Sequence, residues 1–278
     1  MPVDKLKVVA VHEEVRACFK GQFKSGNKSY LPDFKPSAAL RVMAHDAKAG
    51  QRGEHWKIVS AMPSPEKRAI RNDKSDHAVV KINEFRKSAL DGAGLTVLSD
   101  PILSGFEVLN QKELVGNCSE MALAAAYVVA LRRVGTAWVA YIMPPGNHAF
   151  CLVNGGEKPT WKNVKAMLAA PANAWVIDPW ANICCMQHEY AARFADQMRI
   201  WAHHGKHVWM RGAKGADKLG DPSAVAYLSD FESGPIMFVK ACGEVLEKLP
   251  RALQKQRDAK TKPLPGANGR WSPDDDWG

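Results

Sequence analysis

The sequence predicts an α+β domain in which a buried helix packs against an antiparallel sheet. The first observation is a helix pattern over residues 116–133, apolar on nearly all sides, with Cys118 in its first turn. The second is a pair of apolar, strand-like runs over residues 136–143 and 148–154, joined by the turn sequence Pro-Pro-Gly-Asn. A third run over residues 174–177 follows. Because short turns join antiparallel neighbours, these runs predict a sheet on which the helix packs.

Composition sets the broad class of protein. Of the 278 residues, 46% are hydrophobic and 24% are charged, as in soluble globular proteins. There is no uninterrupted apolar run of about 18 residues, so a membrane span is not expected. The first 20 residues mix charges of both signs and contain no apolar core, so they do not resemble a secretory signal peptide. We therefore expect synthesis in the cytoplasm, and we expect the six cysteines to be reduced.

The basic charge is concentrated near the N-terminus. The net charge is +9, and residues 1–100 contain 18 Lys and Arg against 12 Asp and Glu, an excess of six positive charges. A basic surface attracts acidic proteins, anionic membrane surfaces or nucleic acid. The sequence contains no recognisable nucleic-acid-binding motif, so nucleic acid is not an expected partner.

The rest of the chain predicts three parts: a basic, irregular N-terminal region (1–100), a domain around Cys118 (101–250) and a flexible polar tail (251–278). In the first part, strand-like pieces cover residues 7–11 and 56–59, and helical patterns cover 64–70 and 75–90. In the second, we expect helices over residues 161–169, 187–204 and 236–249. The tail is rich in Pro, Gly and charged residues and has no apolar period.

The first residues of the predicted helix around Cys118 indicate how reactive its thiol can be. Asn117 is a favourable N-cap, and Glu120 completes a capping-box pattern. A cysteine in the first turn feels the positive end of the helix dipole, which favours the thiolate. Such a cysteine is either a core residue or the nucleophile of a cysteine enzyme.

His148 and Asp178 favour the nucleophile. His148 opens the strand over residues 148–154 and Asp178 closes the next one, each 30 residues further along the chain. If these strands pair antiparallel, the start of one lies beside the end of the other. A thiolate, an imidazole and a carboxylate together form the set needed for acyl transfer: nucleophile, general base and orienting group.

These residues resemble the papain-like and transglutaminase-like superfamily, which places a Cys at the start of an apolar helix, a His on a strand (here NHAFCLV) and an Asp on the next (here WVIDPW). The match is closest to protein-glutamine glutaminases and to bacterial effector and toxin glutamine deamidases, and it covers roughly residues 105–185. The resemblance implies catalytic roles for Cys118, His148 and Asp178, and a papain/transglutaminase-like architecture.

The sequence also departs from related families. Animal-type transglutaminases have a Trp beside their cysteine, where this chain has Ser119. Papain-type proteases use Asn as the third member and carry an oxyanion-hole Gln six residues before the cysteine, whereas Gln111 lies seven before Cys118. The expected oxyanion donors are the Cys118 backbone N–H and, as a candidate, Gln111.

The resemblance implies a thiol-dependent hydrolase that deamidates glutamine in proteins, without a cofactor. A cysteine protease and a transglutaminase use the same thioester and stay as alternatives. A role in virulence, as an effector or toxin exported by a specialised secretion system into target cells, is a further implication. The alternative from another class is a non-catalytic basic module that binds nucleic acid or a membrane surface.

Two other clusters invite a metal-binding interpretation, but neither has a second paired set at the spacing of zinc ligands, and no metal is expected. They are Cys184-Cys185-x-x-His188 and His203-His204-x-x-His207.

Overall fold

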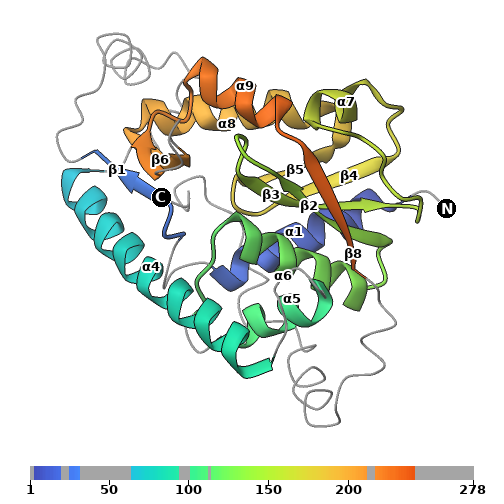
Figure 1. Ribbon diagram of the computed structural model, residues 1–278, viewed down its shortest axis with the longest axis horizontal. Coiled ribbons are helices and arrows are strands. Elements are labelled where there is room, and N and C mark those ends of the chain that lie inside the picture. Colours follow the sequence, from blue (N-terminus) through green and yellow to red (C-terminus); the bar gives the residue numbers. More distant parts are fainter. Residues whose placement is uncertain are drawn as a thin grey trace, which may run out of the picture.

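A computed structural model describes residues 3–19, 25–31, 64–93, 101–111, 114–211 and 217–241, with only the backbone of residues 88–93, 211 and 217. These residues form an α+β structure with antiparallel sheets (Figure 1). The α-helices are α1 (Lys5–Phe19), α4 (Pro65–Ala93), α5 (Pro101–Asn110), α6 (Cys118–Leu131), α7 (Val164–Ala169), α8 (Tyr190–His203) and α9 (Val225–Ser233).

The strands form two sheets in which every neighbouring pair is antiparallel. The larger has the order β5-β4-β3-β2-β8, and the smaller has the order β1-β6-β7. The strands of the larger sheet are β2 (Thr136–Ile142), β3 (His148–Asn154), β4 (Ala174–Asp178), β5 (Ile183–Met186) and β8 (Ile236–Ala241). Those of the smaller are β1 (Lys28–Tyr30), β6 (Lys206–Arg211) and β7 (Asp217–Gly220).

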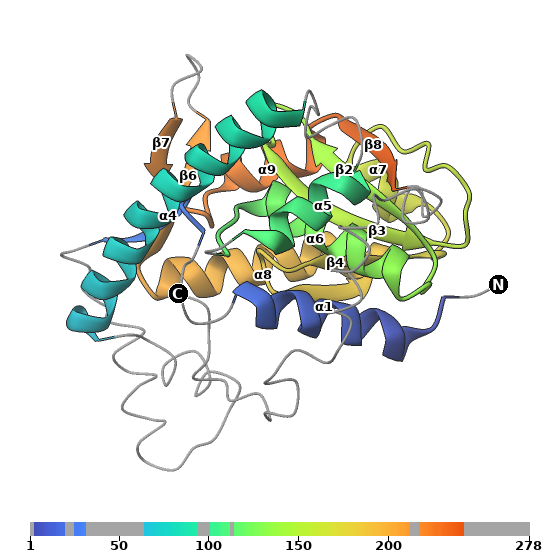
Figure 2. The same cartoon turned by 90° about the horizontal axis from the view of Figure 1, so that it is seen from below.

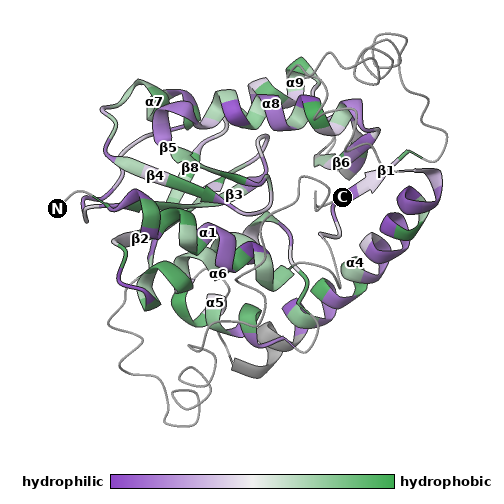
Figure 3. Cartoon of the chain, turned by 180° about the vertical axis from the view of Figure 1, so that it is seen from behind, coloured by the Kyte–Doolittle hydropathy of each residue, from purple (hydrophilic) through white to green (hydrophobic). Residues whose placement is uncertain are grey.

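Helices cover both faces of the larger sheet, so that all seven residues of β3 are buried. Figure 1 shows α1, α5 and α6 on one side of the sheet and α7, α8 and α9 on the other. The long helix α4 lies at the side of the molecule against β1 (Figure 2). Hydrophobic residues gather in the sheet and in the helices that face it, whereas hydrophilic residues dominate α4 (Figure 3). The core therefore lies between the two helical layers.

Helix α6 is the central helix, as its apolar composition predicts. All residues from Glu120 to Val129 are buried against the sheet, α1 and α5. Gly105 allows α5 to lie close against α6: a Cβ atom at this position would lie 2.2 Å from the Leu123 carbonyl oxygen. The rigid position of α6 fixes where Cys118 lies.

Three local predictions are wrong. Residues 7–11 belong to helix α1, because Val8, Val11 and Val15 recur at helical spacing and fill the same core as α6. Residues 236–241 form strand β8 rather than the start of a helix, because they pair with the open edge of β2. The two helical patterns over 64–70 and 75–90 form one helix, α4, in which Ser75 is an interior residue rather than a cap.

The N-terminal part is not irregular over residues 5–19 and 65–93, which are helical and pack with the rest of the described chain. The division into domains stays a prediction. The strand predicted over residues 56–59 and the flexible tail (251–278) lie outside the described residues. In the part that the structure describes, no helix is both long enough and apolar enough to cross a membrane.

Candidate active site

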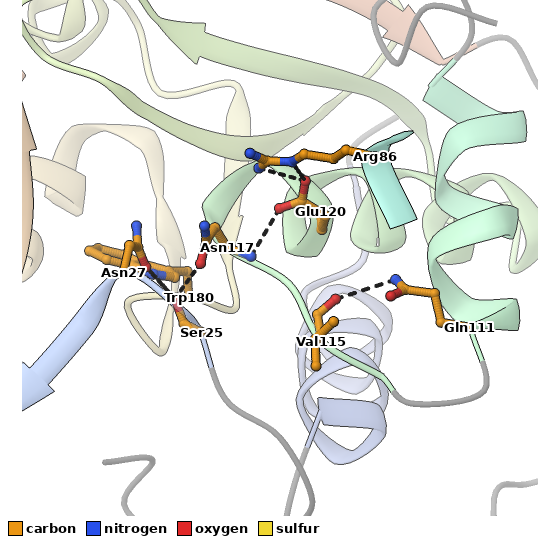
Figure 4. A network of polar contacts seen from close by, with 8 residues as sticks. All are labelled: Ser25, Asn27, Arg86, Gln111, Val115, Asn117, Glu120 and Trp180. Carbon is orange, nitrogen blue, oxygen red and sulfur yellow. Dashed lines mark hydrogen bonds and ion pairs between the residues drawn. The ribbon is translucent and has the colours of Figure 1, made fainter. Parts of the chain in front are cut away.

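Cys118 is the first residue of α6 and is half-buried. The backbone N–H of Asn117 donates to Glu120 Oε2 at 2.9 Å, as the capping-box pattern predicts. Glu120 is in turn paired with Arg86 of α4, whose Nη2 lies 2.7 Å from Oε1 (Figure 4). The thiol thus lies at the N-terminal end of a buried helix whose first turn is held in place by Arg86 of α4.

His148 and Asp178 are brought together by the pairing of β3 with β4. In this register Cys151 faces Ile177, so Asp178 lies diagonally across from His148 on the same face of the sheet. The distance between His148 Nε2 and Asp178 Oδ2 is 2.8 Å. The antiparallel pairing and the meeting of these two side chains are confirmed.

Three donors surround the Asp178 carboxylate, which is fully buried. In addition to His148, the Tyr190 hydroxyl donates to Oδ2 at 2.8 Å, and the backbone N–H of Ala181 donates to Oδ1 at 3.0 Å. Burial by itself would raise the pKa of Asp178, but the charge of His148 and these hydrogen bonds hold the pKa below its ordinary value. Asp178 is therefore a carboxylate at neutral pH.

His148 is held in its charged form. Burial would lower its pKa, but the charge of Asp178, the hydrogen bond to it and the interaction with Cys118 together raise the pKa to about 9. Aromatic rings enclose the imidazole: the centroids of Trp180, Phe194 and Phe231 lie 5.0, 5.2 and 5.9 Å from its own. The ring is thus shielded from water and fixed in orientation.

Cys118 is one of the groups that raise the pKa of His148, after Asp178, so the two side chains lie close enough to interact. Because Nε2 is engaged by Asp178, Nδ1 is the ring nitrogen left for the thiol. The three residues predicted from the sequence therefore meet in one place.

Gln111 has a different environment. Its side-chain nitrogen donates to the carbonyl oxygens of Val108 and Val115, at 3.1 and 3.3 Å, and so links the end of α5 to the segment that leads into α6 (Figure 4). Both hydrogens of this amide have acceptors in its own neighbourhood. Its role as an oxyanion donor stays a prediction.

Three of the other described cysteines lie in environments that raise the pKa of their thiols. Burial raises the pKa of Cys184 to about 11 and that of Cys185 to about 12, so both are protonated thiols at neutral pH. Burial likewise raises the pKa of Cys151. Within the described ranges, no group of three or more His, Cys, Asp or Glu side chains could hold a metal ion.

Several residues of the site were not identified from the sequence. Tyr190 belongs to an aromatic stripe that is typical of packing alone, and Trp180 ends the WVIDPW segment around Asp178, which predicts no role for it. Ser25 and Arg86, which contact the start of α6, lie in a stretch whose composition points only to a basic surface. Of these residues, only Trp180 could have been identified as part of the site, because it lies two positions after Asp178 in the sequence.

No protein-family model, curated protein or solved structure matches this chain.

Proposed function

We propose that this protein is a thiol-dependent amide hydrolase with a papain/transglutaminase-like architecture. One observation carries the proposal: a buried carboxylate, Asp178, is hydrogen-bonded to the imidazole of His148, which also interacts with the half-buried Cys118 at a helix N-terminus. A cationic His148 beside this thiol favours a thiolate–imidazolium pair, the resting form of a cysteine nucleophile.

The reaction follows from these roles. The Cys118 thiolate attacks the amide carbonyl carbon, and the backbone N–H of Cys118 stabilises the oxyanion that forms. As the C–N bond breaks, His148 gives its proton to the leaving nitrogen, and a thioester remains on Cys118. His148 then takes a proton from a water molecule that attacks the thioester. The carboxylic acid product leaves, and the thiolate–imidazolium pair is restored.

We further propose the side-chain amide of glutamine in a protein as the substrate, with glutamate and ammonia as products. The resemblance of the segments around Cys118, His148 and Asp178 to glutamine deamidases of effector and toxin type supports this choice. Export by a specialised secretion system into target cells, and contact with an acidic protein or an anionic surface through the basic N-terminal region, belong to the same proposal.

The test is mass spectrometry of candidate proteins incubated with the wild type, with Cys118→Ala and with Cys184→Ala. Cys184 is a matched control, because it is also half-buried but its thiol is protonated. We expect conversion of glutamine to glutamate with release of ammonia by the wild type and by Cys184→Ala, and no product with Cys118→Ala.

The same experiment separates the alternatives. Cleavage of the backbone would identify a protease, and an amine adduct on glutamine would identify a transglutaminase, since both form the same thioester. If no product depends on Cys118, all three enzymatic proposals are wrong. Salt-sensitive binding to nucleic acid or anionic vesicles that Cys118→Ala leaves unchanged would then favour the basic binding module.

A further inference from the structure

A buried hydroxyl group, that of Ser25, lies at the start of the Cys118 helix. Ser25 is 2% exposed and precedes strand β1. The proton of its Oγ faces two acceptors, Oδ1 of Asn27 and, at 2.9 Å, Oδ1 of Asn117, which is 92 residues away in the sequence (Figure 4). Because Asn117 is the N-cap of α6 and directly precedes Cys118, its hydrogen bond with Ser25 fixes the backbone that carries the thiol.

The Ser25 hydroxyl also contacts Trp180, one of the aromatic residues that pack around His148. The indole Nε1 of Trp180 donates to Ser25 Oγ at 3.0 Å and to Asn27 Oδ1 at 2.9 Å. Trp180 is 3% exposed, and its ring lies against the imidazole of His148 at 5.0 Å between centroids. Ser25 therefore touches one residue that holds the nucleophile and another that packs on the base.

Helix α4 anchors the backbone of the segment that carries Ser25. The hydroxyl of Ser75 donates to the carbonyl oxygens of Ser25 and Lys28, at 3.0 and 2.6 Å. The side chain of Asn72 accepts from the backbone N–H of Tyr30 at 2.7 Å and donates to its carbonyl oxygen at 2.8 Å. The segment that carries Ser25 is thus pinned to a helix at both of its ends.

We propose that Ser25 is a positioning residue that sets the distance between the Cys118 thiol and the His148 imidazole. The proposal rests on the proposed function and adds that Ser25 positions the reacting groups, whereas helix α4 only anchors the backbone of its segment and is not part of the catalytic apparatus. Ser25 is not itself a reacting group. It links the N-cap of α6 to Trp180, so that the nucleophile and the base keep one relative geometry.

The test compares Ser25→Ala with Ser75→Ala. Both serines are almost fully buried in the same place, at 2% and 3% exposure, but the Ser75 hydroxyl bonds only the backbone of the segment. The first readout is the rate at which iodoacetamide alkylates Cys118 at pH 7, followed on the peptide that contains it. The second is the split between kcat and KM for amide hydrolysis, and thermal unfolding controls for folding.

We expect Ser25→Ala to slow alkylation and to lower kcat by about 10- to 100-fold with little change in KM, because misplaced reacting groups cost rate rather than binding. We expect Ser75→Ala to lower the unfolding temperature and to keep both rates within about threefold of the wild type, because a lost hydrogen bond of this kind mainly costs stability. Equal losses in the two variants, or a wild-type alkylation rate in Ser25→Ala, would overturn the proposal.

Trp180→Phe tests the contact between Ser25 and Trp180 from the Trp180 side, because it removes the Nε1 donor and keeps an aromatic ring against His148. If Ser25 and Trp180 act together, the double variant Ser25→Ala/Trp180→Phe loses no more rate than the single variant with the larger loss. Additive losses would contradict it. Alkylation needs no substrate, so it decides the role of Ser25 even if the wild type hydrolyses no amide.

Discussion

The imidazole of His148 and the carboxylate of Asp178 form a buried ion pair, with 2.8 Å between Nε2 and Oδ2 and side chains that are 1% and 0% exposed. Their meeting follows from the antiparallel register of β3 and β4, so it depends on backbone pairing rather than on flexible side chains. A charge pair buried in this way ties the stability of the protein and, under the proposed function, its activity to the protonation state of His148.

We expect the pair to stabilise the fold most between about pH 4 and pH 6.5. The pKa of folded His148 is raised from 6.5 to about 9, so its contribution is complete below pH 6.5 and is lost as the pH rises through about 9. The pKa of Asp178 is lowered from 3.8, so its contribution is lost only as the pH falls below that value. The free energy of unfolding in urea, measured from pH 5 to pH 10, should therefore decline with rising pH. If the free energy of unfolding of Asp178→Asn declined by the same amount over this pH range, the His148–Asp178 pair would not be the cause.

Asp178→Asn should lower kcat/KM by about 10³- to 10⁴-fold, because the carboxylate orients the imidazole and stabilises its charged form. The alkaline limb of the pH–rate profile should also move to lower pH, since Asp178 raises the pKa of His148. Kinetics across pH 5 to 10 provide the measurement. Asp196→Asn, which changes an exposed carboxylate on α8, is the matched control and should behave as the wild type.

Arg86→Ala should destabilise the protein by about 1–2 kcal/mol, because it leaves the Glu120 carboxylate buried without its cation. Glu120 is 2% exposed, whereas Arg86 is 40% exposed, so water screens part of the loss. In a Glu120→Gln background the same substitution should cost less, since no buried charge remains. Urea unfolding of the four proteins gives the coupling energy, and an equal cost of Arg86→Ala in both backgrounds would show that the pair does not matter.

Gln111→Ala should lower stability by about 1 kcal/mol, because the carbonyls of Val108 and Val115 lose their common donor. We expect kcat to stay within about threefold of the wild type, because both hydrogens of the Gln111 amide already have backbone acceptors. Loss of a true oxyanion donor instead lowers kcat by about 10²- to 10³-fold. A fall of that size at unchanged unfolding temperature would assign Gln111 to the oxyanion hole.

Gly105→Ala should destabilise the protein by about 1–3 kcal/mol, because the new methyl group would meet the backbone of α6 and one of the helices must shift. The added Cβ would lie 2.2 Å from the Leu123 carbonyl oxygen and 2.7 Å from Cβ of Tyr127. Thermal unfolding measures the effect. Glu107→Ala, at an exposed position of the same helix, should change the stability little, and equal effects of the two would argue against close packing.

The parts of the fold that the sequence predicts correctly are those with strong local patterns. The all-apolar run after Cys118 and the alternation of strands with tight turns identify α6, β2 and β3. The meeting of His148 with Asp178 then needs only the assumption that consecutive strands pair antiparallel. Both the pattern and the pairing act over about 30 residues, so a single sequence contains the information.

The parts that the sequence does not reveal depend on distant partners. Residues 236–241 are apolar enough for either a helix or a strand, and the free edge of β2 decides between them. Ser25 and Arg86 are a small polar residue and a basic one in a polar stretch, with no pattern that distinguishes them from surface residues. Only folding brings them to the start of α6, where Ser25 contacts a residue 92 positions away in the sequence and Arg86 contacts one 34 positions away.

These long-range contacts have a practical consequence for the expression of a shorter fragment of this protein. A fragment that starts at residue 101 keeps Cys118, His148 and Asp178, yet it would lose the valines of α1, the guanidinium that neutralises Glu120 and the hydroxyl of Ser25. Under the proposed function, such a fragment would keep the three reacting side chains and lose the residues that position them.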